Sequence, residues 1–261
     1  MGEYILPHGL AGEQQRLELM SALLDPVERT CIARLGVRPG WRCLELGCGN
    51  GSISRALAER VAPAGHVVAS DIDIAYIADL QVPCLEVRRI DILQDGIEEG
   101  SYDFVVARAL LHHLSPARKA LERMVSALKP GGVLLSIEPD MLPCTVTEPD
   151  SMFRFWQRWL QWSVEAGIDF SIGRKIPAWL DSFHLEDVAG EGYTAQFNGG
   201  SGWARYWIET IRMVEPALLK SGYVTETVLE ELRTRYQDPH YWTSVISFVA
   251  NWGRKPAGTP C

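Results

Sequence analysis

The sequence lacks the patterns that mark metal scaffolds and membrane proteins. Its six cysteines are scattered over 261 residues without a C-x-x-C pair, so we expect reduced thiols and no metal site. No apolar run approaches the ~18–20 residues that span a bilayer. No secretory leader opens the sequence, and Leu6 stands where a myristoylation signal requires Ser or Thr. These absences predict a cytoplasmic protein without a membrane partner.

Positive charge is also scarce. Lys and Arg number 25 against 33 Asp and Glu, which gives a net charge of −8. This balance argues against nucleic acid as a partner, because the chain has no excess of basic side chains to bind phosphates. Apolar residues make up 47% of the chain, and we find no repeat or low-complexity linker, so we expect a single domain over 1–261.

Strand-like apolar segments alternate with helical patterns through the first half of the chain. A helical cap, 1–40, precedes them, with one helix at 14–24 and a second that begins at Asp25-Pro26. The strands that we expect next are 41–47, 66–71, 84–87, 102–107 and 133–137. The helices between them are 52–62, 74–80 and one that begins with Ser115 as N-cap and Pro116 at its first position. This alternation predicts parallel strands with helices on both faces of the sheet.

The second half of the chain adds helices to this core, which we place at 41–198. One helical addition covers about 148–183 and a second covers 199–239, while strands are expected at 186–196 and 240–253. From Gly253 onward the sequence favours a disordered tail. Four tryptophans of the additions are candidates for a small-molecule pocket: Trp156, Trp159, Trp203 and Trp207. An aromatic stripe at helical spacing is more often part of a core, so both interpretations remain.

The stretch from Trp41 to Ser52 organises the first half. It is a strand that turns on Gly47, Gly49 and Gly51 and then enters a helix, which places backbone N–H groups against a ligand. A dinucleotide fingerprint is incomplete, because Ser52 occupies the position of its last glycine, and no Gly-Lys-Ser/Thr P-loop follows. The acid Glu45 would repel a pyrophosphate. The loop therefore favours a nucleoside cofactor without phosphate.

Over about 41–140 the sequence resembles class I S-adenosylmethionine-dependent methyltransferases. The motifs that carry the resemblance are the glycine loop, Asp71, Asp91-Ile92, the run from Phe104 to Leu114 and the Lys129-Pro130-Gly131-Gly132 turn. The resemblance implies a Rossmann-like fold, α/β, with a seven-stranded, mostly parallel sheet, a reversed last strand and helical lids. It also implies roles for the cofactor-binding residues. The residues concerned are Arg16, Glu45, Gly47, Cys48, Gly49, Asn50, Gly51, Asp71, Ile72, Asp91, Ile92 and Arg108.

Within this set the resemblance assigns Asp71 to the ribose hydroxyls and Asp91-Ile92 to the adenine. The physical chemistry agrees, since one carboxylate can accept both ribose hydroxyl hydrogens. Arg16 or Arg108 would meet the carboxylate of the methionine tail, and Glu45 its ammonium group.

Methyl transfer needs a general base only when the acceptor must lose a proton. Our candidates for catalytic residues are His113, His112 and Asp140, which follow two of the expected strands. His113 is the preferred base or orienting group. Alternatively, the two histidines cap and pack the next helix, and Glu138-Pro139 simply ends a strand.

The sequence thus predicts a methyltransferase that acts on a small apolar or aromatic molecule, with the acceptor atom (O, N or C) open. Two alternatives remain. One is a protein of the same fold that binds the cofactor without methylating, and the other is a nicotinamide-dependent oxidoreductase.

Overall fold

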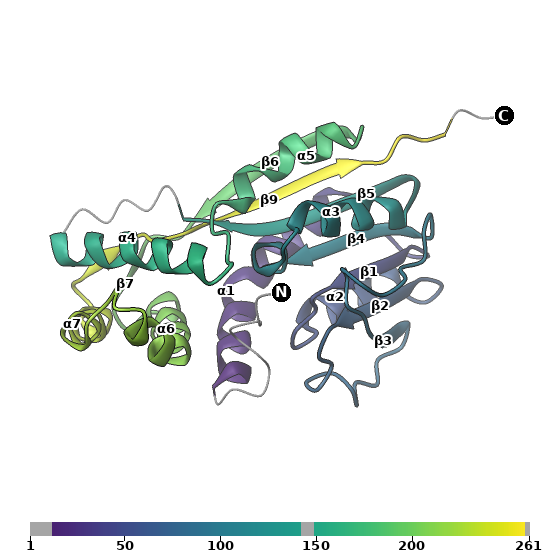
Figure 1. Ribbon diagram of the computed structural model, residues 1–261. Helices are drawn as coiled ribbons and strands as arrows, with labels where there is room; N and C mark the ends of the chain where they lie inside the picture. The colour runs from purple at the N-terminus through teal and green to yellow at the C-terminus, as the bar shows by residue number, and fades with distance from the viewer. Residues whose placement is uncertain (1–11, 142–148, 259–261) are drawn as a thin grey trace.

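The computed structural model describes residues 12–141 and 149–258. Its centre is a seven-stranded sheet in the order β3-β2-β1-β4-β5-β9-β6 (Figure 1). The bounds of these strands are β3 Leu85–Arg89, β2 His66–Asp71, β1 Arg42–Leu46, β4 Tyr102–Arg108, β5 Leu128–Asp140, β9 Ser247–Arg254 and β6 Glu186–Thr194. The first five are parallel, and β9 runs antiparallel to both β5 and β6. The expected mostly parallel sheet with a reversed last strand is confirmed.

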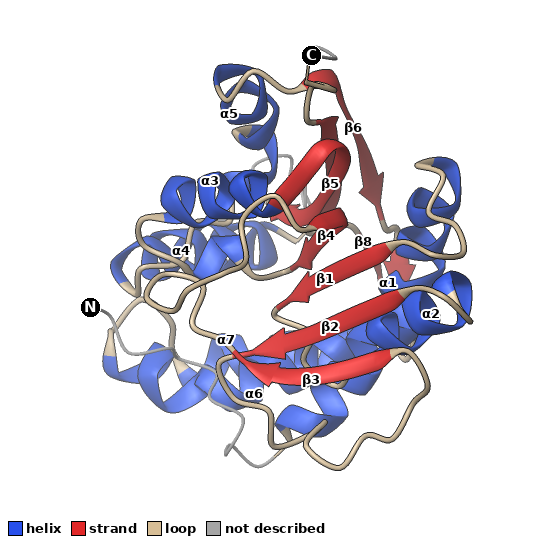
Figure 2. Ribbon diagram, turned by 90° about the vertical axis from the view of Figure 1, so that its right-hand side faces the viewer, coloured by secondary structure: helices blue, strands red, loops and turns tan. Residues whose placement is uncertain are grey.

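Helices cover both faces of this sheet, and Figure 2 shows α2 and α3 on opposite sides of it. Alternate residues of each strand point to opposite faces. On one face Cys43 and Val106 belong to the core cluster of α1 (Glu13–Arg34) and α2 (Ser52–Val61). On the other face Leu44 and Val105 belong to the core cluster of α3 (Ala117–Ala127) and α5 (Ile176–Ser182). Burial on both faces explains why these strands are apolar throughout.

Three further helices gather at one end of the molecule: α4 (Asp150–Glu165), α6 (Gly202–Lys220) and α7 (Glu226–Gln237) (Figure 1). Their aromatic side chains extend the α1 and α2 core. Beside them, β7 (Phe197–Asn198) and β8 (Trp242–Thr243) form a small antiparallel ribbon.

Several expected boundaries were wrong. The two helices of the cap are one helix, α1, with Pro26 inside it. Proline costs a helix interior roughly 3 kcal/mol, but buried residues on both sides of Pro26, among them Leu24 and Cys31, hold the helix to the core. Residues 74–80 form turns instead of a helix.

Three other boundaries also differ from the prediction. Pro116, instead of Ser115, is the N-cap of α3. The expected last strand is broken at 244–246 into β8 and β9, and β9 continues through Arg254 into the segment that we expected to be disordered. There Lys255 donates its backbone N–H to the carbonyl of Gly132, and its Nζ donates to the carbonyl of Leu128. These hydrogen bonds to β5 order a segment whose composition alone favours disorder. Cys144 and Cys261 lie outside the described residues.

Candidate active site

A cavity of about 740 Å³ opens at the carboxyl ends of β1, β2, β4 and β5, beneath α1, α4 and α6. One end is bounded by the glycine loop after β1. The other end is bounded by aromatic side chains of the helical additions. Carboxyl ends of parallel strands are where this class of sheet binds ligands, and the volume lies within the range of small-molecule sites.

The glycine loop is tied to the end of β2. Gly47, Gly49 and Gly51 all have φ between 53° and 71°, a region that side chains other than glycine rarely adopt. Gly49 donates its backbone N–H to Oδ2 of Asp71 at 2.9 Å. At Gly47 a Cβ would lie 3.1 Å from the Leu110 side chain, so the narrow turn also requires glycine there. Gly47, Gly49 and Asp71 line the cavity, whereas Gly51 shapes the turn without lining it.

Helix α1 is hydrogen-bonded to the glycine loop. Ser21 donates its hydroxyl to Oδ1 of Asn50 at 3.2 Å, and Ser52 donates its own to Ser21 and Asp25 at 3.1 Å. Arg108, at the end of β4, forms ion pairs at 2.8 Å with both Asp25 and Glu28 of α1. Most of the guanidinium charge of Arg108 is therefore already balanced by the helix.

Buried carboxyl groups surround that arginine. Burial raises the pKa of Glu45 to about 8, and the negative charge of Glu28 acts in the same direction. The hydroxyl of Ser54 donates to Glu45 and opposes this shift. Burial likewise raises the pKa of Glu28. The cofactor end therefore has an excess of acidic groups, which favours a cationic ligand.

The second predicted arginine, Arg16 of α1, also lines the cavity. Its guanidinium binds both carboxylate oxygens of Glu13, with Nε at 2.7 Å and Nη2 at 2.8 Å. Glu13 lines the same wall. Glu13 was not among the predicted site residues, because its place in this wall depends on the docking of α1.

The predicted adenine end is formed by side chains that follow β2 and β3. Asp71, Ile72, Asp91 and Ile92 all line the cavity. Ile72 is 51% exposed, which is unusual for a large apolar side chain next to a buried strand. The carboxylate of Asp91 accepts the N–H of Leu93 at 2.8 Å, so its own loop fixes its orientation. Cys48 and Asn50 complete this part of the lining.

His112 and His113 lie at the end of β4, in a short 3-10 turn, Leu111–His113. Both rings line the cavity, and their centroids are 3.8 Å apart. Nδ1 of His112 lies 2.9 Å from Oε2 of Glu138. Burial lowers the pKa of His112 to about 3 and that of His113 well below its ordinary value, so both rings are neutral at pH 7.

From the sequence, Glu138 was expected to end a strand or, like Asp140, to bind an amine or take up a proton. It lies in β5 beside the histidine turn, and its signal in the sequence is an acid that directly follows the largely apolar run 133–137. Asp140, two residues further along, was predicted to be catalytic. Its carboxylate binds Arg174 at 2.7 and 3.0 Å, and the side chain does not line the cavity.

The aromatic end contains two of the four predicted tryptophans. Trp159 and Trp207 line it, with centroids 6.0 Å apart and their planes at 89°. Trp156 packs edge-on against Trp207 outside the lining, and Trp203 stacks on Phe197. Other aromatic side chains that line this end are Trp162, Phe170, Tyr206 and Phe248.

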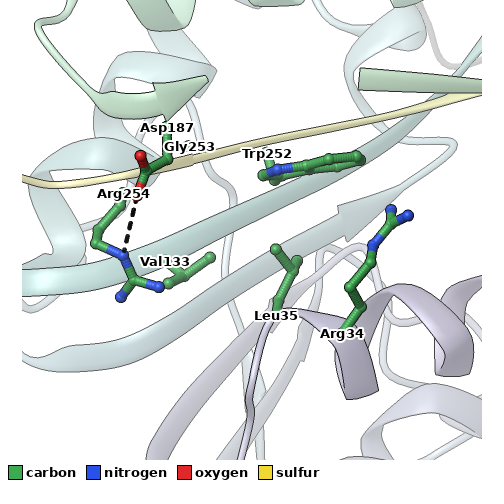
Figure 3. Close-up of a pocket in the computed structure, with 7 residues that line it drawn as sticks. All are labelled: Arg34, Leu35, Val133, Asp187, Trp252, Gly253 and Arg254. Carbon is green, nitrogen blue, oxygen red and sulfur yellow. Dashed lines mark ion pairs between the residues drawn. The ribbon is translucent and has the colours of Figure 1, made fainter. Parts of the chain in front are cut away.

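A second, smaller hollow of about 240 Å³ lies at the opposite rim, near the start of β5 (Figure 3). Its two arginines already have partners. Arg34 binds Glu191 at 2.6 Å and lies over the ring of Trp252, and Arg254 lies 3.8 Å from Asp187. This hollow contains none of the predicted site residues, so the larger cavity is the candidate active site.

The described part of the chain contains no cluster of three His, Cys, Asp or Glu side chains suited to a metal ion. Over the same residues, no helix is both long and apolar enough to cross a membrane.

Comparison with known proteins agrees with this geometry. Residues 44–134 match the family model described as a methyltransferase domain. An uncharacterized 37.1 kDa protein of transposon TN4556 from Streptomyces fradiae is 35% identical over 121 residues, which are 44% of this chain and 35% of that protein. A ubiquinone biosynthesis O-methyltransferase from Xanthomonas campestris is 28% identical over 176 residues, covering 64% of this chain and 72% of the relative.

Among solved structures, phosphoethanolamine N-methyltransferase 2 of Haemonchus contortus, bound to S-adenosylhomocysteine, superposes with a TM-score of 0.57. The match covers 93% of this chain and 52% of that one at 17% identity, which shows a shared fold. The chain thus spans about a third of the transposon protein and most of the Xanthomonas enzyme. Residues 44–134 are thus similar in sequence to a methyltransferase domain, and the chain shares the fold of a solved N-methyltransferase.

Proposed function

We propose that this protein transfers the methyl group of S-adenosylmethionine to a small molecule bound at the aromatic end of the cavity. One observation carries the proposal. A single cavity runs from the glycine loop to Trp159 and Trp207, so a cofactor at one end and an acceptor at the other would share one enclosed space. Holding two reactants in such a space supplies much of the acceleration of a displacement reaction.

The residues of the cofactor end fit this cofactor. The carboxylate of Asp71 suits a ribose diol, and the exposed apolar side chain of Ile72 offers a surface to an adenine ring. Arg16 or Arg108 would meet the methionine carboxylate, and each already pairs with acids of α1, Arg16 with Glu13 and Arg108 with Asp25 and Glu28. When bound, S-adenosylmethionine supplies an electrophilic methyl group on a sulfonium.

The acceptor end supports a small-molecule substrate. Its walls are aromatic and aliphatic side chains under α4 and α6, which would enclose a molecule of modest size and exclude water. The Xanthomonas relative is named as an O-methyltransferase of ubiquinone biosynthesis, which supports a small-molecule acceptor here too. We also propose a cytoplasmic enzyme of one domain, and the net charge of −8 supports an enzyme that works without a nucleic-acid or anionic membrane partner.

Calorimetric titration of the protein with S-adenosylmethionine, S-adenosylhomocysteine and NAD tests the cofactor. We expect both adenosyl compounds to bind and NAD not to bind. Tight binding of NAD without binding of S-adenosylmethionine would instead support an oxidoreductase. Formation of S-adenosylhomocysteine with any acceptor separates a methyltransferase from a protein of the same fold that only binds the cofactor.

A further inference from the structure

The carboxylate of Glu138 is fully buried and surrounded by donors. It accepts backbone N–H groups from Leu110 at 3.0 Å, Leu111 at 2.8 Å and His112 at 3.3 Å. Its fourth contact is Nδ1 of His112 at 2.9 Å. Burial raises the pKa of Glu138 to about 7, and the three backbone N–H donors oppose this shift. The ionised carboxylate can only accept hydrogen bonds. When Glu138 is ionised, Nδ1 of His112 therefore carries the ring proton and Nε2 carries the lone pair.

The ring of His112 is also fixed in orientation. It packs against His113 on one side, and its centroid lies 5.4 Å from that of Phe170 on another. Its backbone carbonyl accepts the N–H of Asp169 at 2.9 Å, which anchors the segment between α4 and α5 to the histidine turn. The charged groups that act on the ring are Glu138, Arg16 and Asp169. His112 therefore presents a neutral imidazole, held in one tautomer, at the wall of the cavity.

Among residues 12–141 and 149–258, the neighbouring aromatic end offers no ionised side chain to an acceptor. The residues of α4, α6, 166–170 and 246–248 that line this end are all uncharged. The members are Trp159, Trp162, Ala166, Gly167, Ile168, Phe170, Tyr206, Trp207, Thr210, Val214, Ile246 and Phe248. A carboxylate, a phosphate or a protonated alkylamine placed there would lose hydration without gaining a counter-ion, which is costly. The wall thus selects an uncharged acceptor.

We propose that His112, positioned by Glu138, is the general base that removes the proton from a hydroxyl group of an uncharged aromatic or apolar acceptor. This inference rests on the proposed function and adds its acceptor class. The acceptor oxygen forms a bond to the methyl carbon while the carbon–sulfur bond breaks and its electron pair stays on sulfur. The hydroxyl proton moves to Nε2 of His112. The resulting imidazolium keeps its Nδ1–H bond to the carboxylate of Glu138, and this ion pair opposes the burial that lowers the pKa of His112 to about 3.

Nitrogen NMR tests the tautomer without any acceptor. In protein labelled with ¹⁵N-histidine and saturated with S-adenosylhomocysteine, we expect a protonated Nδ1 and an unprotonated Nε2 for His112. In Glu138→Gln, the amide oxygen would still accept the N–H groups of Leu110 and Leu111, and the amide nitrogen would donate to Nδ1 of His112. That substitution should invert the tautomer. A protonated Nε2 in the wild-type protein overturns the proposal.

Three acceptors of one size test the class: 2-naphthol, 2-naphthylmethylamine and 2-naphthoate. We expect wild-type protein to methylate only the naphthol. His112→Asn keeps an N–H near the position of Nδ1, and it should lower turnover roughly 10²- to 10⁴-fold while the Kd for S-adenosylmethionine is unchanged. Glu138→Gln should lower turnover and change the pH profile, whereas the exposed controls His240→Gln and Glu59→Gln should not.

The outcomes separate this inference from the proposed function. Absence of S-adenosylmethionine binding in the wild-type protein contradicts the proposed function itself. If the cofactor binds but naphthol is left unmethylated, is methylated more slowly than the amine or the acid, or reacts equally well after His112→Asn, only the general-base inference is overturned.

Discussion

The backbone N–H of Gly49 and the carboxylate of Asp71 are joined by a hydrogen bond of 2.9 Å between the loop after β1 and the end of β2. Asp71 is almost fully buried, yet it lines the cavity. Its carboxylate is therefore held in position before a ribose arrives. Such preorganisation lowers the entropy that binding must overcome.

Replacing Asp71 by Ala should weaken S-adenosylmethionine binding by roughly 2–3 kcal/mol, because charge-assisted hydrogen bonds to the ribose are lost. Calorimetry gives the affinity. An analogue of S-adenosylhomocysteine without the 2′-hydroxyl should bind the wild-type protein more weakly than the parent compound and bind Asp71→Ala equally well. The exposed Asp187→Asn serves as the control. An unchanged affinity in Asp71→Ala would mean that the ribose binds elsewhere.

Helix α1 should depend on Arg108 for its attachment. Arg108→Ala leaves Glu28 buried without its cation, and breaking a buried ion pair in this way costs about 3–5 kcal/mol. Urea unfolding at neutral pH measures the loss. Arg154→Ala, which removes an exposed ion pair with Asp150 on α4, should cost no more than about 1 kcal/mol. Equal losses in the two variants would show that α1 is held by its apolar contacts alone.

Local patterns were sufficient to predict the sheet and the cofactor end. The glycines, Glu45 and Asp71 are close in sequence to the strands that carry them, and parallel strands bring their carboxyl ends together wherever the helices go. The prediction therefore included most of the residues that line this end. The roles of single residues in cofactor binding stay predictions.

The positions of the side chains on α4 and α6 and in the histidine turn depend instead on long-range packing. Whether Trp156 or Trp159 faces the cavity is decided by the rotation of α4 against α6, and an aromatic stripe does not encode that rotation. Glu13 reaches the site only because α1 continues through Pro26 and docks on the glycine loop. The contact between Glu138 and His112 joins residues 26 positions apart, across two strands.

Trp159 and Trp156 form a matched pair for testing the acceptor end. Both are buried on α4, but only Trp159 lines the cavity. Trp159→Phe should raise the KM for the acceptor several-fold and leave the Kd for S-adenosylmethionine unchanged. Trp156→Phe should lower the free energy of unfolding by about 1–3 kcal/mol through lost packing and leave the KM unchanged. Steady-state kinetics and urea unfolding measure both effects. An equal change of KM in the two variants would contradict the assignment of Trp159 to the substrate wall.

The buried Glu45 should make stability depend on pH. Its pKa is raised by burial from 4.5 to about 8, so the folded protein holds this proton more tightly than the unfolded chain does. Its contribution to stability is therefore full below pH 4.5 and is lost as the pH rises through about 8. Glu45→Gln carries an amide that cannot lose a proton. The variant should lack this decline, which amounts to about 1.4 kcal/mol for each pH unit of the window.

Urea unfolding of both proteins across that pH window measures the difference, with the exposed Glu99→Gln as control. Parallel pH curves for the wild-type protein and Glu45→Gln would show that Glu45 is ionised throughout. Because a cationic cofactor favours the carboxylate, saturating S-adenosylmethionine should flatten the decline in the wild-type protein and leave the slope of Glu45→Gln unchanged. That second result would tie the buried acid to the cofactor, since a purely structural acid would respond to pH equally with and without the ligand.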